Sequence, residues 1–127
     1  MLQLYKDRSL EVGKKVRVYF NLHTHLFSIV SMEGQYKGKV VAHGNGIAIT
    51  DAKFKVNKTG QLRVRKIRRK SVHAYVDGIF SGVAEETLSK KAYYNPYKTD
   101  YFINWESKEN VFEADKVVLK DKRVTYL

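Results

Sequence analysis

Apolar and polar residues alternate along several short segments of this chain, and this two-residue period restricts its fold more than any other feature. From Lys15 to Asn21, valine or phenylalanine occupies every second position. The same alternation runs from Ala52 to Val56 and from Val72 to Val76. A period of two is typical of a β-strand with one buried face. The sequence therefore predicts a mainly β fold, with α+β at its margin.

Short turns separate these segments and favour antiparallel neighbours. Further strands are predicted at Leu26–Met32, Lys39–His43, Tyr101–Trp105, Val111–Leu119 and Arg123–Leu127. A chain of 127 residues suits one domain better than two. We predict a single antiparallel sheet, either rolled or closed into a small barrel. It would form one domain over residues 1–127, with residues 1–13 as a loosely ordered lead-in.

The alternation on either side of Lys58–Gly60 predicts a β-hairpin closed by a three-residue loop. In that register Lys55 lies opposite Arg63, and Lys53 lies opposite Arg65. Like charges directly across a hairpin destabilise it by roughly 0.2–1 kcal/mol per pair. A ribbon with four cations on one face would therefore need an external anion to offset the repulsion.

One helix is predicted, within Ser81–Ala92 and near residues 82–91. Ser81 is a suitable N-cap, and the acidic residues of this segment precede its basic residues. That order complements the helix macrodipole.

Positive charge is concentrated in the first part of the chain. The formal net charge is +11. Residues 1–75 contain 16 lysines and arginines against four acidic residues, whereas residues 76–127 contain eight against nine. The densest run holds six cations in eight residues and no acid: Arg63, Arg65, Lys66, Arg68, Arg69 and Lys70. Such asymmetry is typical of a face that binds a polyanion.

These cations predict a nucleic-acid-binding protein, with RNA or single-stranded DNA favoured over duplex. Tyrosines near the cations could stack on unpaired bases, as in single-strand binders. The predicted contact residues are Arg17, Lys53, Lys55, Arg63, Arg65, Lys66, Arg68, Arg69, Lys70, Tyr19 and Tyr75. The aromatic cluster from Tyr93 to Trp105 could be a second stacking surface, although packing between elements explains most of it better.

A metal-independent ribonuclease is the first alternative. Such an enzyme needs an acid, a base and a cation beside the scissile phosphate, and histidine suits the first two roles. The candidate catalytic residues are His23, His43 and His73, with His25 able to replace His23. Scattered surface histidines beside a basic patch would show the same pattern, so an enzyme is not favoured.

A protein that binds an acidic host factor, or that serves in the virion, is the second alternative, because a basic face also fits an acidic protein. The absence of cysteine excludes a thiol nucleophile and a cysteine metal site. The H-x-H pair His23–His25 has no acidic residue beside it, so we expect no metal site and no cofactor. No segment is apolar over the length of a membrane span.

Several segments resemble a family of small proteins of tailed bacteriophages and prophages. The similar segments span residues 16–23, 38–43, 54–56, 69–78 and 94–97. The resemblance implies a phage origin and expression in the cytoplasm of a host bacterium. It transfers no activity and no catalytic residue to this chain.

Overall fold

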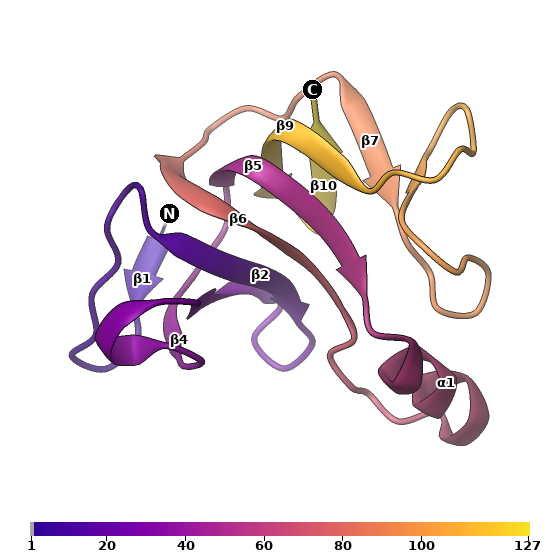
Figure 1. Cartoon of the computed structure of the whole chain (residues 1–127), viewed down its shortest axis with the longest axis horizontal. Helices are drawn as coiled ribbons and strands as arrows, with labels where there is room; N and C mark the ends of the chain where they lie inside the picture. Colours follow the sequence, from indigo (N-terminus) through magenta and orange to yellow (C-terminus); the bar gives the residue numbers. More distant parts are fainter. Residues whose placement is uncertain (1) are drawn as a thin grey trace.

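A computed structural model describes residues 2–127, in which ten strands form one antiparallel sheet (Figure 1). The strand order is β1-β4-β3-β2-β6-β5-β9-β10-β7-β8. The strands are β1 (Leu2–Leu4), β2 (Lys15–Asn21), β3 (Leu26–Ser31), β4 (Val40–Gly44), β5 (Ile47–Val56), β6 (Ala74–Val83), β7 (Lys90–Tyr93), β8 (Ile103–Asn104), β9 (Glu113–Lys120) and β10 (Arg123–Tyr126). A 3-10 turn, η1 (Gly34–Tyr36), and one helix, α1 (Lys58–Ile67), complete the secondary structure of these residues.

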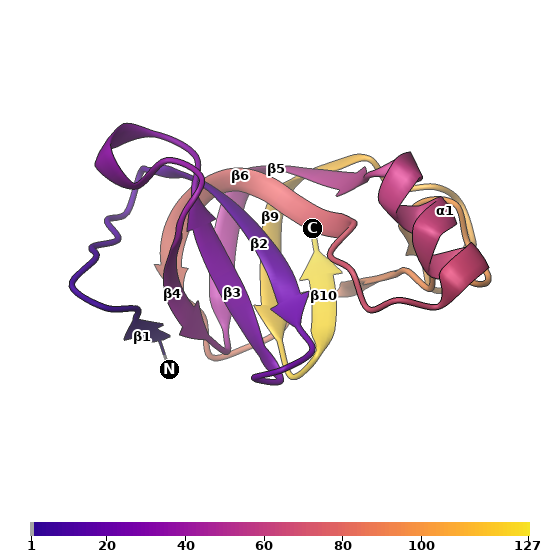
Figure 2. The same cartoon turned by 90° about the horizontal axis from the view of Figure 1, so that it is seen from below.

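The sheet is strongly curled, and Figure 2 shows its strands bending around a common interior with α1 to one side. The long central strands β5 and β6 lose register twice, between Ala48 and Ile49 and between Thr50 and Lys53. Asp51 lies in the second irregularity with φ 49°. Bulges of this kind bend a strand and increase its twist. The predicted rolled antiparallel sheet is confirmed. It is not a closed barrel, because the strand order has two free ends, β1 and β8.

The core lies inside the curl and is built from the apolar side of the alternating strands. Val16 and Val18 of β2 are buried, whereas Lys15 is exposed. Three consecutive residues of β9, Val117–Leu119, are buried. The segment after β6 covers the outer side of this strand. Leu88 N–H of that segment donates to Thr125 Oγ1, and Thr125 pairs with Val118 of β9. An aromatic cluster around Phe54 extends the core toward α1.

The segment predicted as the second half of a hairpin is the helix α1, so that prediction was wrong. Asn57 caps the helix, and its side chain accepts a hydrogen bond from Gly60 N–H at 3.0 Å. Val64 is buried but Leu62 is exposed, so their alternation reflects the helix surface and not a strand. The cross-strand cation pairs that the hairpin predicted are therefore absent, and the repulsion argued from them is not present in that form.

Gly60 of α1 must be a glycine because His73 packs closely against it. A Cβ atom added to Gly60 would lie 2.7 Å from the Cβ atom of His73. Any larger residue would push α1 away from the chain that leads into β6. Gly60, which favours a turn when read in the sequence, therefore serves helix packing instead.

The helix predicted near residues 82–91 is also absent. Residues up to Val83 extend β6, and Lys90 begins β7. Gly82 has φ +116°, outside the range of a helix. Ala84 N–H donates to Gly46 O at 2.7 Å. Long-range pairing with β5 thus satisfies the hydrogen-bonding groups of this backbone. This pairing outweighs the helix-favouring composition of the segment.

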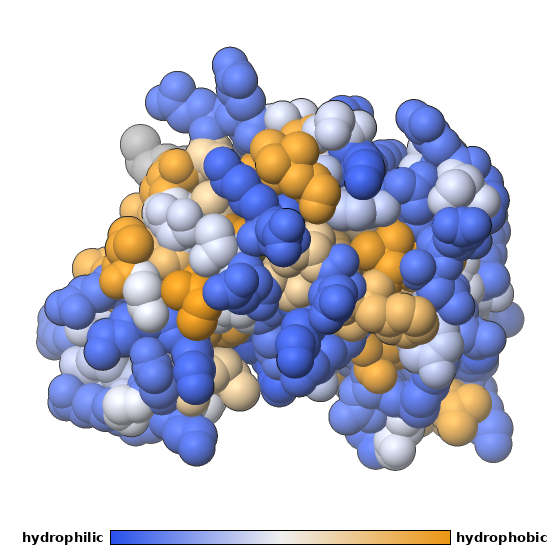
Figure 3. Space-filling view, turned by 45° about the horizontal axis from the view of Figure 1, so that its top comes forward, coloured by the Kyte–Doolittle hydropathy of each residue, from blue (hydrophilic) through white to orange (hydrophobic). Residues whose placement is uncertain are grey.

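None of the helices in the described part of the chain is both long and apolar enough to cross a membrane. On the face shown in Figure 3, hydrophilic residues predominate and apolar residues form separate small patches. Charged side chains, not a continuous apolar area, therefore characterise this face.

Candidate nucleic-acid interface

The predicted cations fall into two groups. The first lies at the C-terminal end of α1 and in the loop that follows it, and we call it the helix–loop group: Arg63, Lys66, Arg68, Arg69 and Lys70. The second lies on the outer face of the sheet: Arg17, Lys53 and Lys55. A single ribbon of cations was expected, whereas the structure divides them between a helix and a sheet.

The helix–loop group is exposed and has no acidic partner. All five side chains are open to solvent. The ion pairs among residues 2–127 involve none of these five cations. The backbone turns sharply at Arg68, which lies in the left-handed region with φ 53° and donates its N–H to Val64 O at 2.9 Å. This turn places the last three cations in a loop beyond the helix.

The helix is attached to the segment 94–101 through Gln61. Its side chain is only 1% exposed. Its Nε2 amide donates to Tyr94 Oη at 3.1 Å, to Asp100 O at 3.0 Å and to Thr99 O at 3.3 Å. Burial raises the pKa of the Tyr94 phenol, and the hydrogen bond from Gln61 opposes that effect. The helix–loop group is thus held on a fixed support.

Arg65 was predicted to contact phosphate, but its guanidinium joins α1 to the same segment. It donates to Pro96 O and to Thr99 O, and it pairs with Asp100 Oδ1 at 3.0 Å. Arg65 thus directs three of its five guanidinium N–H donors to acceptors within the protein. Its position points to a structural role.

On the sheet, one carboxylate pairs with two of the predicted cations. Asp77 of β6 accepts from Arg17 Nε at 2.8 Å and from a terminal Arg17 nitrogen at 3.0 Å, and its second oxygen pairs with Lys55 Nζ at 3.2 Å. The hydrogen bond that Arg17 donates to Asp77 raises the pKa of Arg17, and burial opposes this effect. The Arg17 guanidinium also lies 3.9 Å from the centre of the Tyr75 ring. Lys53 is exposed and lies across from Asp77 and Glu113 in the adjacent strands.

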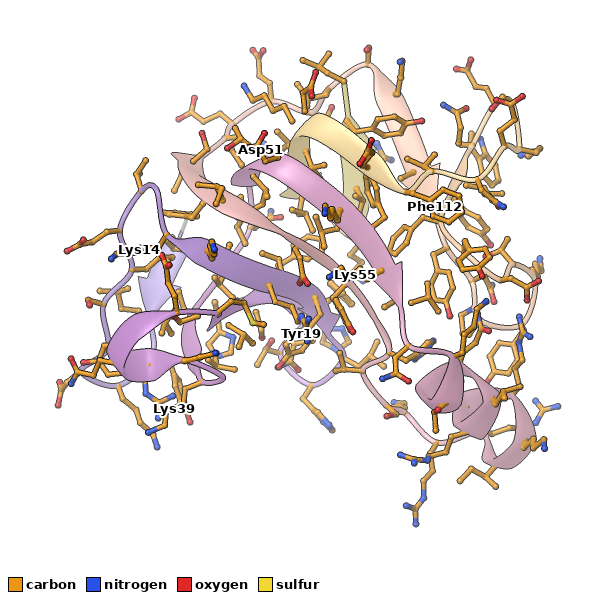
Figure 4. The ribbon with its side chains drawn as sticks, viewed as in Figure 1. Lys14, Tyr19, Lys39, Asp51, Lys55 and Phe112 are labelled. Atoms are coloured by element: carbon orange, nitrogen blue, oxygen red, sulfur yellow. The ribbon has the colours of Figure 1, made fainter. Side chains whose placement is uncertain are left out.

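The predicted stacking residues Tyr19 and Tyr75 lie on the sheet and not beside the helix–loop group. Both border a groove of about 390 Å³ together with Tyr93. Figure 4 shows Tyr19 and Lys55 on the sheet, apart from α1. The cations at this groove are Lys91, Lys122 and Arg123.

Exposed aromatic residues lie next to α1. They belong to the cluster from Tyr93 to Trp105, for most of which packing between elements was predicted. Phe102 does pack in the core, against Phe54. Tyr97 and Tyr101, however, are exposed, and each carries a cation from the α1 region near its ring. The turn at Asn95-Pro96 in the aromatic cluster was the available signal, since a turn exposes its flanking side chains.

A phage protein family matches nearly the whole chain. The model of the family described as Mycobacterium phage L5 gene 82 protein matches residues 9–127. The gene 82 protein of Mycobacterium phage L5 is 35% identical over 117 residues, which cover 87% of this chain and 93% of the relative. The chain belongs to this family. The predicted resemblance to a phage family is therefore confirmed. No solved structure is significantly similar to the chain.

Two candidate catalytic histidines of this gene 82 family protein, His43 and His73, lie far apart. His23 is exposed in the turn between β2 and β3. His43 on β4 lies 2.9 Å from Ser28 Oγ and packs against the Tyr5 ring. His73 is buried just before β6, and its Nδ1 lies 2.8 Å from Ser71 O. Two strands separate β4 from β6, which places these strands roughly 14 Å apart. His43 and His73 are therefore not arranged for acid–base catalysis on one phosphate.

Replacing Asp77 by asparagine in this gene 82 family protein should lower the free energy of unfolding by about 2 kcal/mol, because the hydrogen bonds of a charged group are lost. The amide keeps the shape of the carboxylate but leaves the Arg17 and Lys55 charges uncompensated. Urea denaturation measures the effect. Asp115→Asn makes the same change at an exposed position of β9 and should cost under about 0.5 kcal/mol. Equal losses in both variants would show that the Asp77 ion pairs do not stabilise the fold.

Proposed function

We propose that this protein binds nucleic acid in the host bacterium, with RNA or single-stranded DNA favoured over duplex, and that it does so without catalysis. The helix–loop group would contact the phosphates. The observation that carries this proposal is that no ion pair among residues 2–127 joins a carboxylate to any of these five cations. Arg17, Lys55 and Arg65 all have such partners elsewhere in the same protein.

The local electrostatics support an external anion. Arg63, Lys66 and the three cations of the loop lie within eight residues, so their mutual repulsion opposes the compact arrangement of this segment. The last turn of α1 offsets part of that repulsion, because the helix C-terminus favours cations. Phosphates of a nucleic acid would offset the rest and would release condensed counterions on binding.

The separation of the histidines supports binding without cleavage. A ribonuclease mechanism needs two groups in contact with one phosphodiester, and His43 and His73 lie on opposite sides of the β3–β2 pair. His73 is also buried beneath Gly60 of α1, out of reach of a phosphate on the surface. We therefore propose no catalytic role for these residues.

A salt titration of binding tests the proposal. With fluorescein-labelled U20 RNA and fluorescence anisotropy, the logarithm of the affinity should fall against the logarithm of salt concentration with a slope of about −3.5, since each of five contacts contributes about −0.7 for a single strand. A dT20 strand tests DNA in the same way. Affinity that hardly changes with salt would contradict phosphate binding by this group.

An acidic protein partner, in the host or in the virion, is the second candidate function. Leu62, Ile67 and Val72 are exposed among the cations. Exposed apolar side chains add little to phosphate binding, but they are typical of a protein interface. Retention of a defined partner after nuclease treatment, and its loss in a Leu62→Ser, Ile67→Ser variant, would favour this candidate over nucleic acid.

A further inference from the structure

Three exposed aromatic rings line the side of α1 that faces the segment 94–112. Tyr97 is 54% exposed, Tyr101 is 37% exposed and Phe112 is 53% exposed. Tyr101 and Phe112 meet edge to face, with ring centres 5.2 Å apart. Single exposed aromatic residues are common, but a pair in contact beside a basic helix is a distinct surface. We call these three residues the aromatic platform.

Cations from both ends of α1 accompany the platform. Lys58, in the first turn, places its Nζ 3.8 Å from the centre of the Tyr101 ring. Arg68, at the C-terminal end, lies 5.9 Å from the centre of the Tyr97 ring. The ten residues of α1 span about 15 Å. Arg68 therefore connects the helix–loop group to Tyr97, and Lys58 lies beside Tyr101 near the other end of α1.

The backbone fixes the platform in place. Tyr101 precedes the buried Phe102, whose carbonyl accepts a hydrogen bond from Val111 N–H at 2.8 Å. Phe112 O accepts from Phe54 N–H of β5 at 2.9 Å. A platform whose backbone is held in this way loses less freedom when a ligand arrives, so binding costs less conformational entropy. Figure 4 shows Phe112 at the side of the molecule that carries α1.

We infer that Tyr97, Tyr101 and Phe112 stack on unpaired bases of a single-stranded nucleic acid whose phosphates bind the helix–loop group. Flat apolar rings with cations beside them match the two parts of a nucleotide, the base and the phosphate. The bases of a duplex stack on one another and leave no free faces, so this surface selects single strands. This assignment rests on the proposed function and adds its base-binding residues.

Binding of labelled U20, dT20 and a 20-base-pair duplex to a Tyr101→Ala, Phe112→Ala variant tests the inference. Affinity for both single strands should fall about tenfold or more, duplex affinity should stay within about twofold, and the salt slope should not change. Tyr5→Ala is the matched control: Tyr5 is 39% exposed and has Lys6 within 5.3 Å of its ring centre, but it lies next to β1 at the far edge of the sheet. The Tyr5→Ala variant should bind all three probes with wild-type affinity.

The variants also separate this inference from the proposed function. Tyr97→Ala removes an exposed ring, so this variant should fold even if the double variant does not. It should lower the affinity for single strands and leave the affinity for duplex unchanged. If Tyr97→Ala and a folded double variant both bind single strands with wild-type affinity, the inference is overturned. Salt-dependent binding by the wild-type protein would still leave the proposed function intact. Loss in a Tyr19→Ala, Tyr75→Ala variant instead would place the bases at the sheet groove and would also overturn it. A wild-type protein that binds none of the three probes would remove the proposed function itself.

Discussion

Reversing the charge at Arg68, Arg69 and Lys70 with glutamate should lower nucleic-acid affinity by at least about a hundredfold near 0.1 M salt, because three phosphate contacts become repulsive. The three side chains are exposed and follow the last turn of α1. None of them contributes to the core, so the fold should tolerate the change. Anisotropy with labelled U20 measures the loss, and circular dichroism checks the fold.

A variant with Lys14, Lys37 and Lys39 replaced by glutamate is the matched control. It changes the net charge by the same amount at exposed positions. Figure 4 shows Lys14 and Lys39 at the end of the molecule opposite α1. Its affinity should fall by less than about fivefold, since distant surface charges act only through a screened field. Equal losses in the two variants would show that total charge, and not the helix–loop group, determines binding.

Gly46→Ala should lower the free energy of unfolding by about 3 kcal/mol, one of the largest losses available from a single methyl group in this chain. Gly46 has φ +80°, where an L side chain is strained. An added Cβ atom would also overlap the backbone carbonyl oxygen of Ala84, which cannot move without breaking the hydrogen bonds around it. Urea denaturation measures the loss.

Gly38→Ala separates the cost of backbone strain from the cost of the overlap with Ala84. Gly38 has φ +82°, almost the same backbone conformation, but its added Cβ atom would meet no atom within 4 Å. It should therefore cost only the backbone strain, about 1 kcal/mol. A cost at Gly46 no greater than that at Gly38 would show that the contact with Ala84 relaxes freely.

The strands of the sheet could be predicted because their burial is one-sided. In β2 every second residue enters the core, so the pattern of one strand is visible without knowledge of its neighbours. The hairpin of β9 and β10 across Lys120–Lys122 was also predicted, although three consecutive residues of β9 are buried. The curl of the sheet toward an open roll could not be fixed in the same way, because it depends on bulges in β5 and β6 that appear only when the strands are paired.

The helix α1 was missed because it buries so little. Val64 is its main apolar contact with the protein, and with Leu62 it imitates a strand. The Asn57 cap was visible in the sequence, but the Gly60 that follows suggested a turn more strongly. The contact that requires Gly60 comes from His73, thirteen residues later, and no local pattern reveals it.

The cations of the candidate site could be predicted from the sequence, whereas their partners and the aromatic rings beside them could not. A dense run of cations is a local property, so the helix–loop group could be read directly. The pairing of Arg17 with Asp77 joins residues 60 positions apart, and it depends on the register between β2 and β6. The aromatic platform depends in the same way on the docking of α1 against residues 94–101.

The attachment of α1 through Gln61 has a dynamic consequence. The helix and the segment 94–101 hold each other through side-chain hydrogen bonds, whereas strand pairing links the sheet residues to one another. Two segments joined in this way open and close as one cooperative unit, with lower local stability than the sheet. A ligand that touches both would slow amide hydrogen exchange in both together and leave exchange in β5 and β6 unchanged.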